Sequence, residues 1–245
     1  MHFLDSHIHL QDYKTQEVKN VVNNAAKNNV MRFINASAHP NDWPAIKEIT
    51  EQYPQIIPAF GVHPWHIGDI SDMWQEKLER YLLQNPRAIV GECGIDRLKN
   101  SDTEAQINIL LPQIKLANKL NRPLIIHAVK ANAEFGELFP ILPERTVFHS
   151  FTGSAEWGKE IQKRGFFIGL NFSVLRKKNN TEILRSISLE KVLLETDGPY
   201  QNNTDGETLP QNLQFLAEQI ATLSGISIAE FSDILADNQR KFLGE

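Results

Sequence analysis

The sequence predicts a (β/α)8 TIM barrel formed by a single domain over residues 1–245. Three observations support this fold class: strand-like and helix-like segments alternate along the chain, the strand-like segments are strongly apolar, and the length suits the fold. Strands that alternate with helices pair in parallel, because each return crossover needs a helix. A barrel of this kind typically needs about 250 residues, and no linker or change in composition divides the chain.

The predicted strands are short runs rich in β-branched and aromatic residues. The runs 124–126 and 192–194 are so apolar that they suit a sheet buried on both faces. A doubly wound open sheet fits the same alternation, but no glycine-rich phosphate loop follows the first strand, so the barrel is favoured. In chain order the expected strands are 3–9, 30–36, 56–61, 88–92, 123–127, 146–149, 165–170 and 191–196.

Four segments between or after these strands carry clear helix signals. The stretch after Thr15 repeats apolar residues at the spacing of one buried helix face. Ser71 is expected to cap the N-terminus of a helix after the third strand. Ser101 and Glu104 have the spacing of a capping box, and Pro210 is expected to open the last amphipathic region. These signals place helices where the alternation requires them.

The composition is that of an ordinary globular protein with a sizeable core. Hydrophobic residues make up 41% and charged residues 22% of the chain, and the formal net charge is −5. This charge argues against a protein that coats nucleic acid through bulk positive charge, but an enzyme that binds a few phosphates locally is compatible with it. Cys93 is the single cysteine. With no signal peptide or membrane-spanning run, we expect a cytoplasmic protein that makes no membrane contact.

The first candidate metal ligands lie on the first predicted strand. His7 and His9 are two positions apart, so both side chains leave the strand by the same face. Two imidazoles one pleat apart suit an ion such as Zn²⁺. Taken alone, a His-x-His pair is more often surface or hydrogen-bonded structure. Asp5 shares this face, where it would orient a histidine or cap a turn.

Four further candidates lie at the ends of other predicted strands. Glu92 follows an apolar run, where its carboxylate needs a partner; the alternative to a metal ion is an internal salt bridge. His127 and His149 would otherwise be hydrogen-bonded core histidines, and Asp197 a simple turn former. Because the carboxyl ends of barrel strands converge on one mouth, metal binding explains all of these residues together.

The number of candidate ligands predicts two divalent metal ions, because one zinc ion usually takes four. The predicted ligands are His7, His9, Glu92, His127, His149 and Asp197. Glu92 is expected to bridge the ions, and Asp197 to orient a metal-activated water and take its proton, so these two are the predicted catalytic residues. Mixed histidine and carboxylate ligands fit Zn²⁺, Mn²⁺, Ni²⁺ or Fe²⁺, and Mg²⁺ less well.

The motifs around these residues resemble those of the TatD-related metal-dependent hydrolases and deoxyribonucleases, within the amidohydrolase-like superfamily. The resemblance covers essentially the whole chain and rests on six motifs in the family's order: Asp5-Ser6-His7-Ile8-His9-Leu10, Gly61-Val62-His63-Pro64, Gly91-Glu92-Cys93-Gly94-Ile95-Asp96, Ile126-His127, His149-Ser150-Phe151-Thr152-Gly153 and Glu195-Thr196-Asp197-Gly198-Pro199-Tyr200. It implies a divalent-metal phosphodiesterase with the same six ligands. It also implies that His63 faces the bound phosphate; the alternative is a turn residue fixed by Pro64.

Two departures from the family's pattern remove positive charge from the surface that would face a phosphate backbone. His127 is followed by Ala-Val-Lys-Ala at 128–131, where the family usually has x-Arg-Asp-Ala. The loop 201–207 is short and acidic where the family usually has a basic loop. In addition, Arg97 replaces an aromatic residue of the family. The sequence therefore supports a metal site more strongly than a DNA-binding surface.

Basic and aromatic residues elsewhere offer some compensation. Arg176, Lys177 and Lys178 follow the predicted seventh strand, a region that often binds phosphate in this fold, and Lys178 is the candidate substrate contact. The alternative is that these cations belong to a solvated approach to a helix. Trp65 and His66 would stack on a base or sugar, or Trp65 would pack on its neighbours.

The preferred function is therefore a metal-dependent phosphodiesterase, a deoxyribonuclease that acts on DNA or a short nucleic acid. The alternative keeps the metal site but takes a small ester, amide or phosphoester as substrate, because phosphate-binding residues are depleted. A barrel that keeps metal for stability and binds a partner is a third class, which the intact ligand set disfavours. The sequence carries no indication of the oligomeric state.

Overall fold

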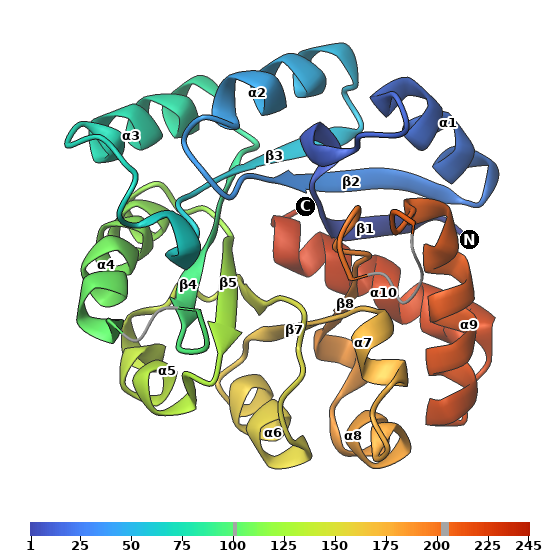
Figure 1. The fold of residues 1–245 in the computed structure, drawn as a ribbon. Coiled ribbons are helices and arrows are strands. Elements are labelled where there is room, and N and C mark those ends of the chain that lie inside the picture. The colour runs from blue at the N-terminus through green and yellow to red at the C-terminus, as the bar shows by residue number, and fades with distance from the viewer. Residues whose placement is uncertain (100–101, 202–205) are drawn as a thin grey trace. The chain divides into compact units, whose positions relative to one another are not determined.

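The computed structural model describes residues 1–99, 102–201 and 206–245, along which eight strands alternate with helices (Figure 1). Strand order follows chain order from β1 to β8. This is the connectivity of a (β/α)8 barrel, as predicted. The chain divides into two compact units: unit 1 comprises residues 1–34 and 149–245, and unit 2 comprises residues 35–148. That the whole chain is one domain stays a prediction.

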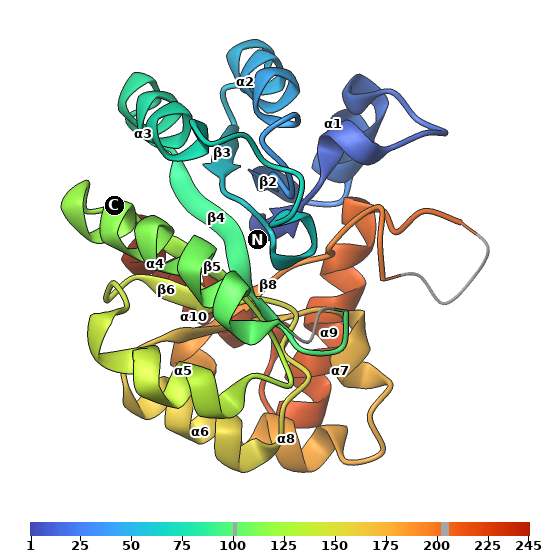
Figure 2. The ribbon, with the colours of Figure 1, turned by 60° about the vertical axis from the view of Figure 1, so that its left-hand side comes forward.

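Unit 2 is built from parallel strands with helices between them. Its strands are β3 (Ile56–Phe60), β4 (Ile89–Asp96), β5 (Leu124–Val129) and β6 (Thr146–Phe148). They pair in parallel and in chain order. Its helices are α2 (Trp43–Gln52), η2 (Pro64–His66), α3 (Trp74–Gln84), α4 (Thr103–Lys119), α5 (Asn132–Leu138) and η3 (Phe139–Ile141). Helices α2, α3 and α4 lie on the outer side of the strands (Figure 2), which leaves β3, β4 and the first half of β5 fully buried.

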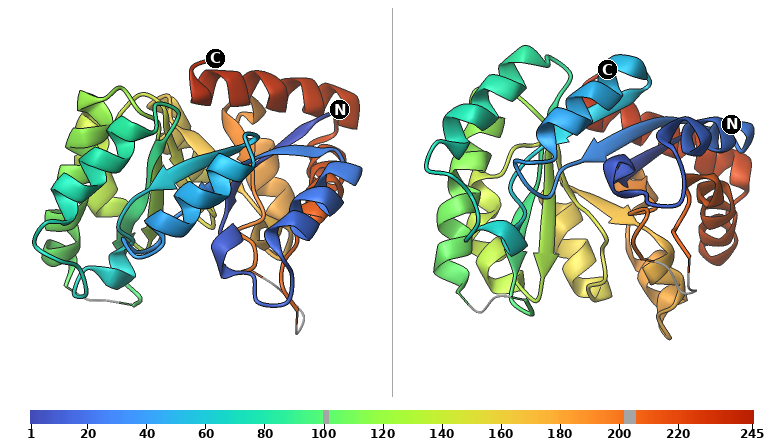
Figure 3. Two further views of the ribbon diagram at one scale, coloured as in Figure 1. Left: turned by 90° about the horizontal axis from the view of Figure 1, so that it is seen from above. Right: turned by 45° about the horizontal axis from the view of Figure 1, so that its top comes forward.

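Unit 1 brings the two ends of the chain together. Its strands are β1 (Phe3–Ile8), β7 (Phe167–Leu170) and β8 (Val192–Leu194), and β2 (Val30–Ala36) begins in it. Its helices are η1 (Leu10–Asp12), α1 (Val18–Lys27), α6 (Ala155–Lys163), α7 (Phe172–Leu175), α8 (Asn180–Ser186), η4 (Leu189–Lys191), η5 (Pro210–Asn212), α9 (Leu213–Ser224) and α10 (Ile228–Leu243). The helix α10 packs against α9, β8 and β1 (Figure 3). After β8, the backbone nitrogen of Asp197 donates to the backbone oxygen of His7 near the end of β1 at 2.9 Å, so the ends of β1 and β8 lie side by side.

The fourth strand is longer than predicted. It does not end at Glu92 but continues to Asp96, because Gly94, Ile95 and Asp96 pair with β5 residues 127–129. The pairing register shifts between Val90 and Cys93, which marks a β-bulge or irregularity in this stretch. Glu92 therefore lies within the strand, and a second carboxylate, Asp96, ends it.

The helix starts differ from the sequence predictions at two places. Ser71 does not cap α3, whose N-cap is Met73 without a side-chain hydrogen bond; the backbone oxygen of Ser71 accepts from Trp74 in the turn before the helix. Ser101 lies outside the described residues, and α4 is capped by Asp102, whose carboxylate accepts from the Ala105 backbone nitrogen at 2.9 Å. Within the part of the chain that the structure describes, no helix has the length and apolarity that crossing a membrane requires.

Candidate metal centre

Cluster 1, in unit 1, consists of His7, His9 and Asp197, which the ends of β1 and β8 bring together. The Nε2 atoms of His7 and His9 face each other at 3.1 Å. The Oδ1 atom of Asp197 lies 3.5 Å from Nε2 of His9 and 3.8 Å from Nε2 of His7. All three side chains are buried, and their donor atoms lie within 4.8 Å of one another. The pair that the sequence indicated only weakly is thus joined by a carboxylate from the other end of the chain.

His149 lies against this cluster. Its ring stacks on the ring of His7, with centroids 4.1 Å apart and planes inclined by 16°. Its Nδ1 atom lies 3.6 Å from Oε1 of Glu195, a fully buried carboxylate that also accepts from the Ser150 backbone nitrogen at 2.5 Å. Sequence reasoning missed Glu195, although it lies two residues before Asp197 at the end of the same strand. It is placed to orient His149.

Asp5 supports cluster 1 through the backbone. Its Oδ1 atom accepts from the backbone nitrogens of His7 at 3.3 Å and Thr196 at 2.9 Å, and its Oδ2 atom accepts from the Thr196 hydroxyl at 2.5 Å. Burial raises the pKa of Asp5 to about 7, against the opposing effect of the hydrogen bonds from Thr196 and His7. These hydrogen bonds link the segments that carry His7 and Asp197, and thus support the interpretation of Asp5 as an orienting residue.

The charge state of Asp197 follows from its neighbours. Burial by itself raises the pKa of this carboxyl, but the hydrogen bond to His9 and the electrostatic influence of His7 and His149 outweigh burial, so that its pKa lies below its ordinary value. Asp197 is therefore ionised at neutral pH. An ionised carboxylate can either bind a metal ion or accept a proton.

Cluster 2, in unit 2, consists of His63, Glu92 and His127. Oε1 of Glu92 lies 2.9 Å from Nδ1 of His127 and 3.2 Å from Nε2 of His63. His63 and Glu92 are 5% and 3% exposed, so the carboxylate that the sequence placed in an apolar environment is indeed buried beside imidazoles. His63 follows β3 and shares Glu92 with His127, which makes it a candidate ligand as well as the predicted phosphate contact.

Both clusters fit divalent metal ions by their donor atoms. Bonds of about 2.0–2.2 Å from zinc to nitrogen or oxygen, at tetrahedral angles, place neighbouring ligand atoms roughly 3.3–3.6 Å apart. The donor atoms lie 3.1, 3.5 and 3.8 Å apart in cluster 1, and the two contacts of Glu92 in cluster 2 are 2.9 and 3.2 Å, so both sets lie close to this spacing. Without a proton or a cation between them, facing lone pairs at these distances would repel each other. The residues present are thus able to bind metal ions.

Comparison with known proteins identifies the family. The sequence model of the TatD-related DNases matches residues 4–244. The chain belongs to the TatD-related DNase family. An uncharacterized metal-dependent hydrolase of Methanocaldococcus jannaschii is 26% identical to it, over 98% of this chain and 96% of that protein. The human deoxyribonuclease TATDN3 is 26% identical over 97% of this chain and 93% of its own length.

A solved structure of the TatD family has the same fold. The crystal structure of YJJV, a TatD homologue from Escherichia coli K12, matches with a TM-score of 0.91 at 25% identity and covers 99% of this chain and 98% of that one. The predicted (β/α)8 barrel and the predicted enzyme class are therefore confirmed: the chain is a metal-dependent hydrolase of the TatD type.

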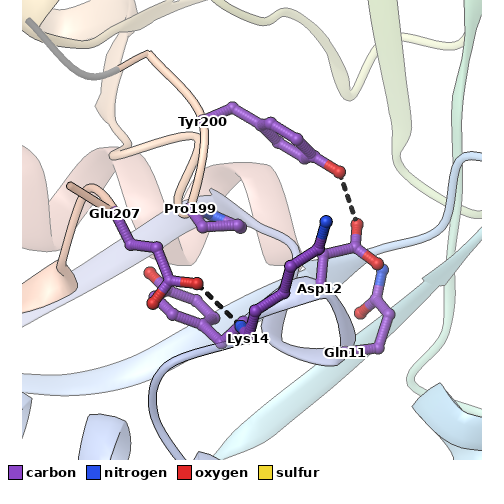
Figure 4. Close-up of a pocket in the computed structure, with 7 residues that line it drawn as sticks. Gln11, Asp12, Lys14, Pro199, Tyr200 and Glu207 are labelled. Carbon is purple, nitrogen blue, oxygen red and sulfur yellow. Dashed lines mark hydrogen bonds between the residues drawn. The ribbon is translucent and has the colours of Figure 1, made fainter. Parts of the chain in front are cut away.

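In this TatD-family hydrolase, an open cavity of about 560 Å³ lies beside the segments that follow β1 and β8 (Figure 4). It is lined by Gln11, Asp12, Tyr13, Lys14, Pro199, Tyr200 and Glu207. The ring of Tyr200 stands edge-on to the ring of His9, with centroids 5.4 Å apart, and its hydroxyl donates to Asp12 at 2.9 Å. Glu207 accepts from the Lys14 backbone nitrogen at 2.7 Å. The segments after β1 and β8 are thus tied together around the cavity.

The basic residues considered for phosphate binding, Arg176, Lys177 and Lys178, lie on the turn between α7 and α8. Arg176 lies 3.3 Å from the side-chain oxygen of Gln201, and Lys177 donates to the backbone oxygen of Thr152. Lys178 is exposed, and its contact with substrate stays a prediction. The acidic loop predicted to depart from the family pattern falls partly on residues 202–205, outside the described residues.

Proposed function

We propose that this TatD-family hydrolase cleaves phosphodiester bonds in DNA with two divalent metal ions. The observation that carries the proposal is the presence of two buried groups of histidine and carboxylate donors, cluster 1 and cluster 2, each with ligand spacing. The name of the human relative, deoxyribonuclease TATDN3, supports the substrate class. One ion per cluster is the proposed stoichiometry, and Zn²⁺, Mn²⁺, Ni²⁺ and Fe²⁺ are the ions that suit the donors best. That Glu92 is shared by both ions stays a prediction.

The residues of cluster 1 define the proposed chemistry. When bound, divalent ions activate water and polarise a phosphoryl oxygen. Asp197 is ionised and its Oδ1 atom belongs to the donors of cluster 1. A carboxylate has two oxygens, so one can bind an ion while the other accepts the proton that the attacking water loses. His149, whose Nδ1 atom lies 3.6 Å from Glu195, adds a donor beside His7. The proposed step is an in-line displacement at phosphorus: the water oxygen bonds to phosphorus as the P–O bond to the leaving sugar oxygen breaks, and that oxygen leaves as an alcohol after taking up a proton. That His63 contacts the phosphoryl group stays a prediction.

A second function is favoured by the charge of the cavity beside cluster 1. Among the lining residues in the described part of the chain, Asp12 and Glu207 are acidic and Lys14 is basic. A phosphate backbone is attracted by positive charge, so this lining suits a small ester, amide or phosphoester better than a long polyanion. We propose this hydrolase activity as the alternative.

Turnover of single-stranded DNA compared with small chromogenic phosphodiesters and carboxylic esters separates the two functions. The assay is run with Mg²⁺, Mn²⁺ and Zn²⁺, and Lys178→Ala is included to test the exposed turn. A deoxyribonuclease would degrade DNA, with a KM that rises in Lys178→Ala. If small esters turn over and no phosphodiester does, the first proposal is wrong and the alternative is supported.

A further inference from the structure

A carboxylate that is not among the six predicted ligands lies directly behind cluster 2. Asp96 ends β4, is 3% exposed, and its Oδ2 atom lies 3.2 Å from Nε2 of His127. The other ring nitrogen of His127, Nδ1, faces Glu92 at 2.9 Å. His127 is therefore held between two carboxylates, and only Glu92 is shared with His63 in the cluster that can hold a metal ion.

We propose that Asp96 is a positioning residue that holds His127 in the tautomer that binds metal, with Trp65 fixing Asp96. This inference rests on the proposed function, because it assigns a role within a metal site that cluster 2 is proposed to form. Histidine ligands generally donate their second ring N–H to a carboxylate, a carbonyl or water, which fixes both the tautomer and the orientation of the ring.

The hydrogen bonds of Asp96 determine which atom carries the proton. Oδ1 accepts from the backbone nitrogens of Leu98 at 2.9 Å and Lys99 at 3.1 Å, and Oδ2 accepts from Nε1 of Trp65 at 2.7 Å. Asp96 is thus surrounded by donors and acts as an acceptor. Its contact with Nε2 of His127 then requires a proton on Nε2, because a carboxylate cannot donate.

A proton on Nε2 leaves the lone pair of a neutral imidazole on Nδ1. Nδ1 of His127 faces Oε1 of Glu92, which is a second acceptor. Two acceptors 2.9 Å apart are stable when a proton or a metal ion lies between them, and in the metal-loaded protein the ion takes that place. The Asp96 contact therefore turns the metal-binding nitrogen of His127 toward the metal-binding oxygen of Glu92.

The position of Trp65 supports the same arrangement. Its side chain is 53% exposed, yet its indole nitrogen is turned inward to Asp96. Trp65 lies in η2 and Asp96 ends β4, so two elements converge on His127. Gln106 holds the backbone of Asp96 on both sides, because its Oε1 accepts from the Asp96 nitrogen at 2.6 Å and its Nε2 donates to the Asp96 oxygen at 3.2 Å. Such fixation is expected of a residue that sets the orientation of a ligand.

Asp96→Asn tests the inference, because asparagine has nearly the size of aspartate but carries an NH₂ group in place of one of the two accepting oxygens. The side-chain oxygen of the asparagine would still accept from the backbone nitrogens of Leu98 and Lys99. Its NH₂ group would then face Nε2 of His127 and favour the opposite tautomer, with the proton on Nδ1. Titration of metal-free protein with Zn²⁺ against a chromophoric chelator is expected to show about 10–100-fold weaker binding at one site. Long-range ¹H–¹⁵N spectra of the zinc-loaded proteins are expected to show His127 protonated at Nε2 in the wild type and a changed tautomer in the variant.

Two further variants separate positioning from general stability. Glu79→Gln removes a carboxylate of unit 2 that pairs with Lys119 at the surface, and is expected to bind Zn²⁺ like the wild type. Trp65→Phe keeps an aromatic ring but removes the donor to Asp96, and is expected to weaken Zn²⁺ binding less than Asp96→Asn, with an unchanged melting temperature of the metal-free protein. If Asp96→Asn does not fold, the zinc affinity of Trp65→Phe, measured by the same titration, tests the inference instead.

Wild-type affinity and tautomer in Asp96→Asn, or in Trp65→Phe where the first variant does not fold, would overturn the inference. Because metal binding is measured without substrate, a wild-type protein that binds Zn²⁺ but cleaves no DNA contradicts only the proposed substrate. A wild-type protein that binds no metal contradicts both.

Discussion

Asp197 is the single side chain on which the proposed chemistry depends most. Asp197→Asn keeps the shape of cluster 1 but removes the ionised oxygen that faces His9, so hydrolysis is expected to fall by about 10²–10⁴-fold. The rate is measured on whichever substrate the wild type turns over. Asp237→Asn is the matched control in unit 1, because Asp237 pairs with Lys241 on the surface of α10. Unchanged turnover in Asp197→Asn would contradict the assignment.

Cys93 offers a test of the interior of β4. Its side chain is fully buried, and burial, with a smaller contribution from Glu92, raises the pKa of the thiol above its ordinary value. The thiolate is the reactive form, so the native protein is expected to react with a disulfide reagent at pH 8 far more slowly than the unfolded chain. Since Cys93 is the one cysteine in the sequence, release of the chromophore reports on it alone. Equal rates in the two states would mean that β4 is open to solvent.

At the residue scale, spacing and context predicted the candidate ligands but not the carboxylates that hold them. His7 and His9 share a strand face by the two-residue period, which is visible in the sequence. Asp96 was missed because the strand was expected to end at Glu92, although residues 92 and 96 have the same parity and therefore share a face. Glu195 was missed for a different reason: it lies within the predicted strand 191–196, but only Asp197, at the end of that strand, was taken as a candidate ligand. The ligand assignment itself stays a prediction until metal is measured.

At the scale of elements, the contact between β4 and β5 positions cluster 2. A side chain at Gly94 would overlap the backbone oxygen of His127. Gly94→Ala is therefore expected to push the strands apart, to lower the free energy of unfolding by about 1–3 kcal/mol or more, and to weaken metal binding through His127. Denaturant unfolding and zinc titration measure the two effects.

Gly136→Ala is the matched control for this prediction. Gly136 lies in α5, where a Cβ meets nothing within 4 Å. Alanine is the better helix former, so this variant is expected to raise the free energy of unfolding by about 0.5–1 kcal/mol. If Gly94→Ala and Gly136→Ala changed the free energy of unfolding equally, the close approach of β4 to β5 would not be the reason for a glycine at position 94.

Element types were more predictable than element ends. Apolar runs indicated the strands and helical periodicity indicated the helices, because both patterns reflect which side chains are buried. The ends depend on local contacts that the pattern does not contain. Ser71 looked like a helix cap, but the chain turns once more before α3 begins after Met73. The extension of β4 depends on pairing with β5, which is a contact between distant residues.

At the scale of the whole molecule, the alternation of strands and helices predicted the barrel, since parallel pairing requires crossover helices. The substrate was less predictable, because it depends on the charge and shape of loops. The cavity beside cluster 1 is formed by segments that follow β1 and β8. No periodic pattern in the sequence predicts the contact between Tyr200 and Asp12 in its lining. Metal binding and substrate choice are therefore separate questions in this fold.

The central claim, that the chain binds metal through its two clusters, is tested most directly by elemental analysis of protein purified without chelators. We expect about two divalent ions per chain, with one lost in the cluster 1 variant His9→Ala and one lost in the cluster 2 variant His127→Ala. Activity is expected to disappear with chelator and to return with added metal. A wild-type protein without bound metal, or metal content that neither variant changes, would contradict the account.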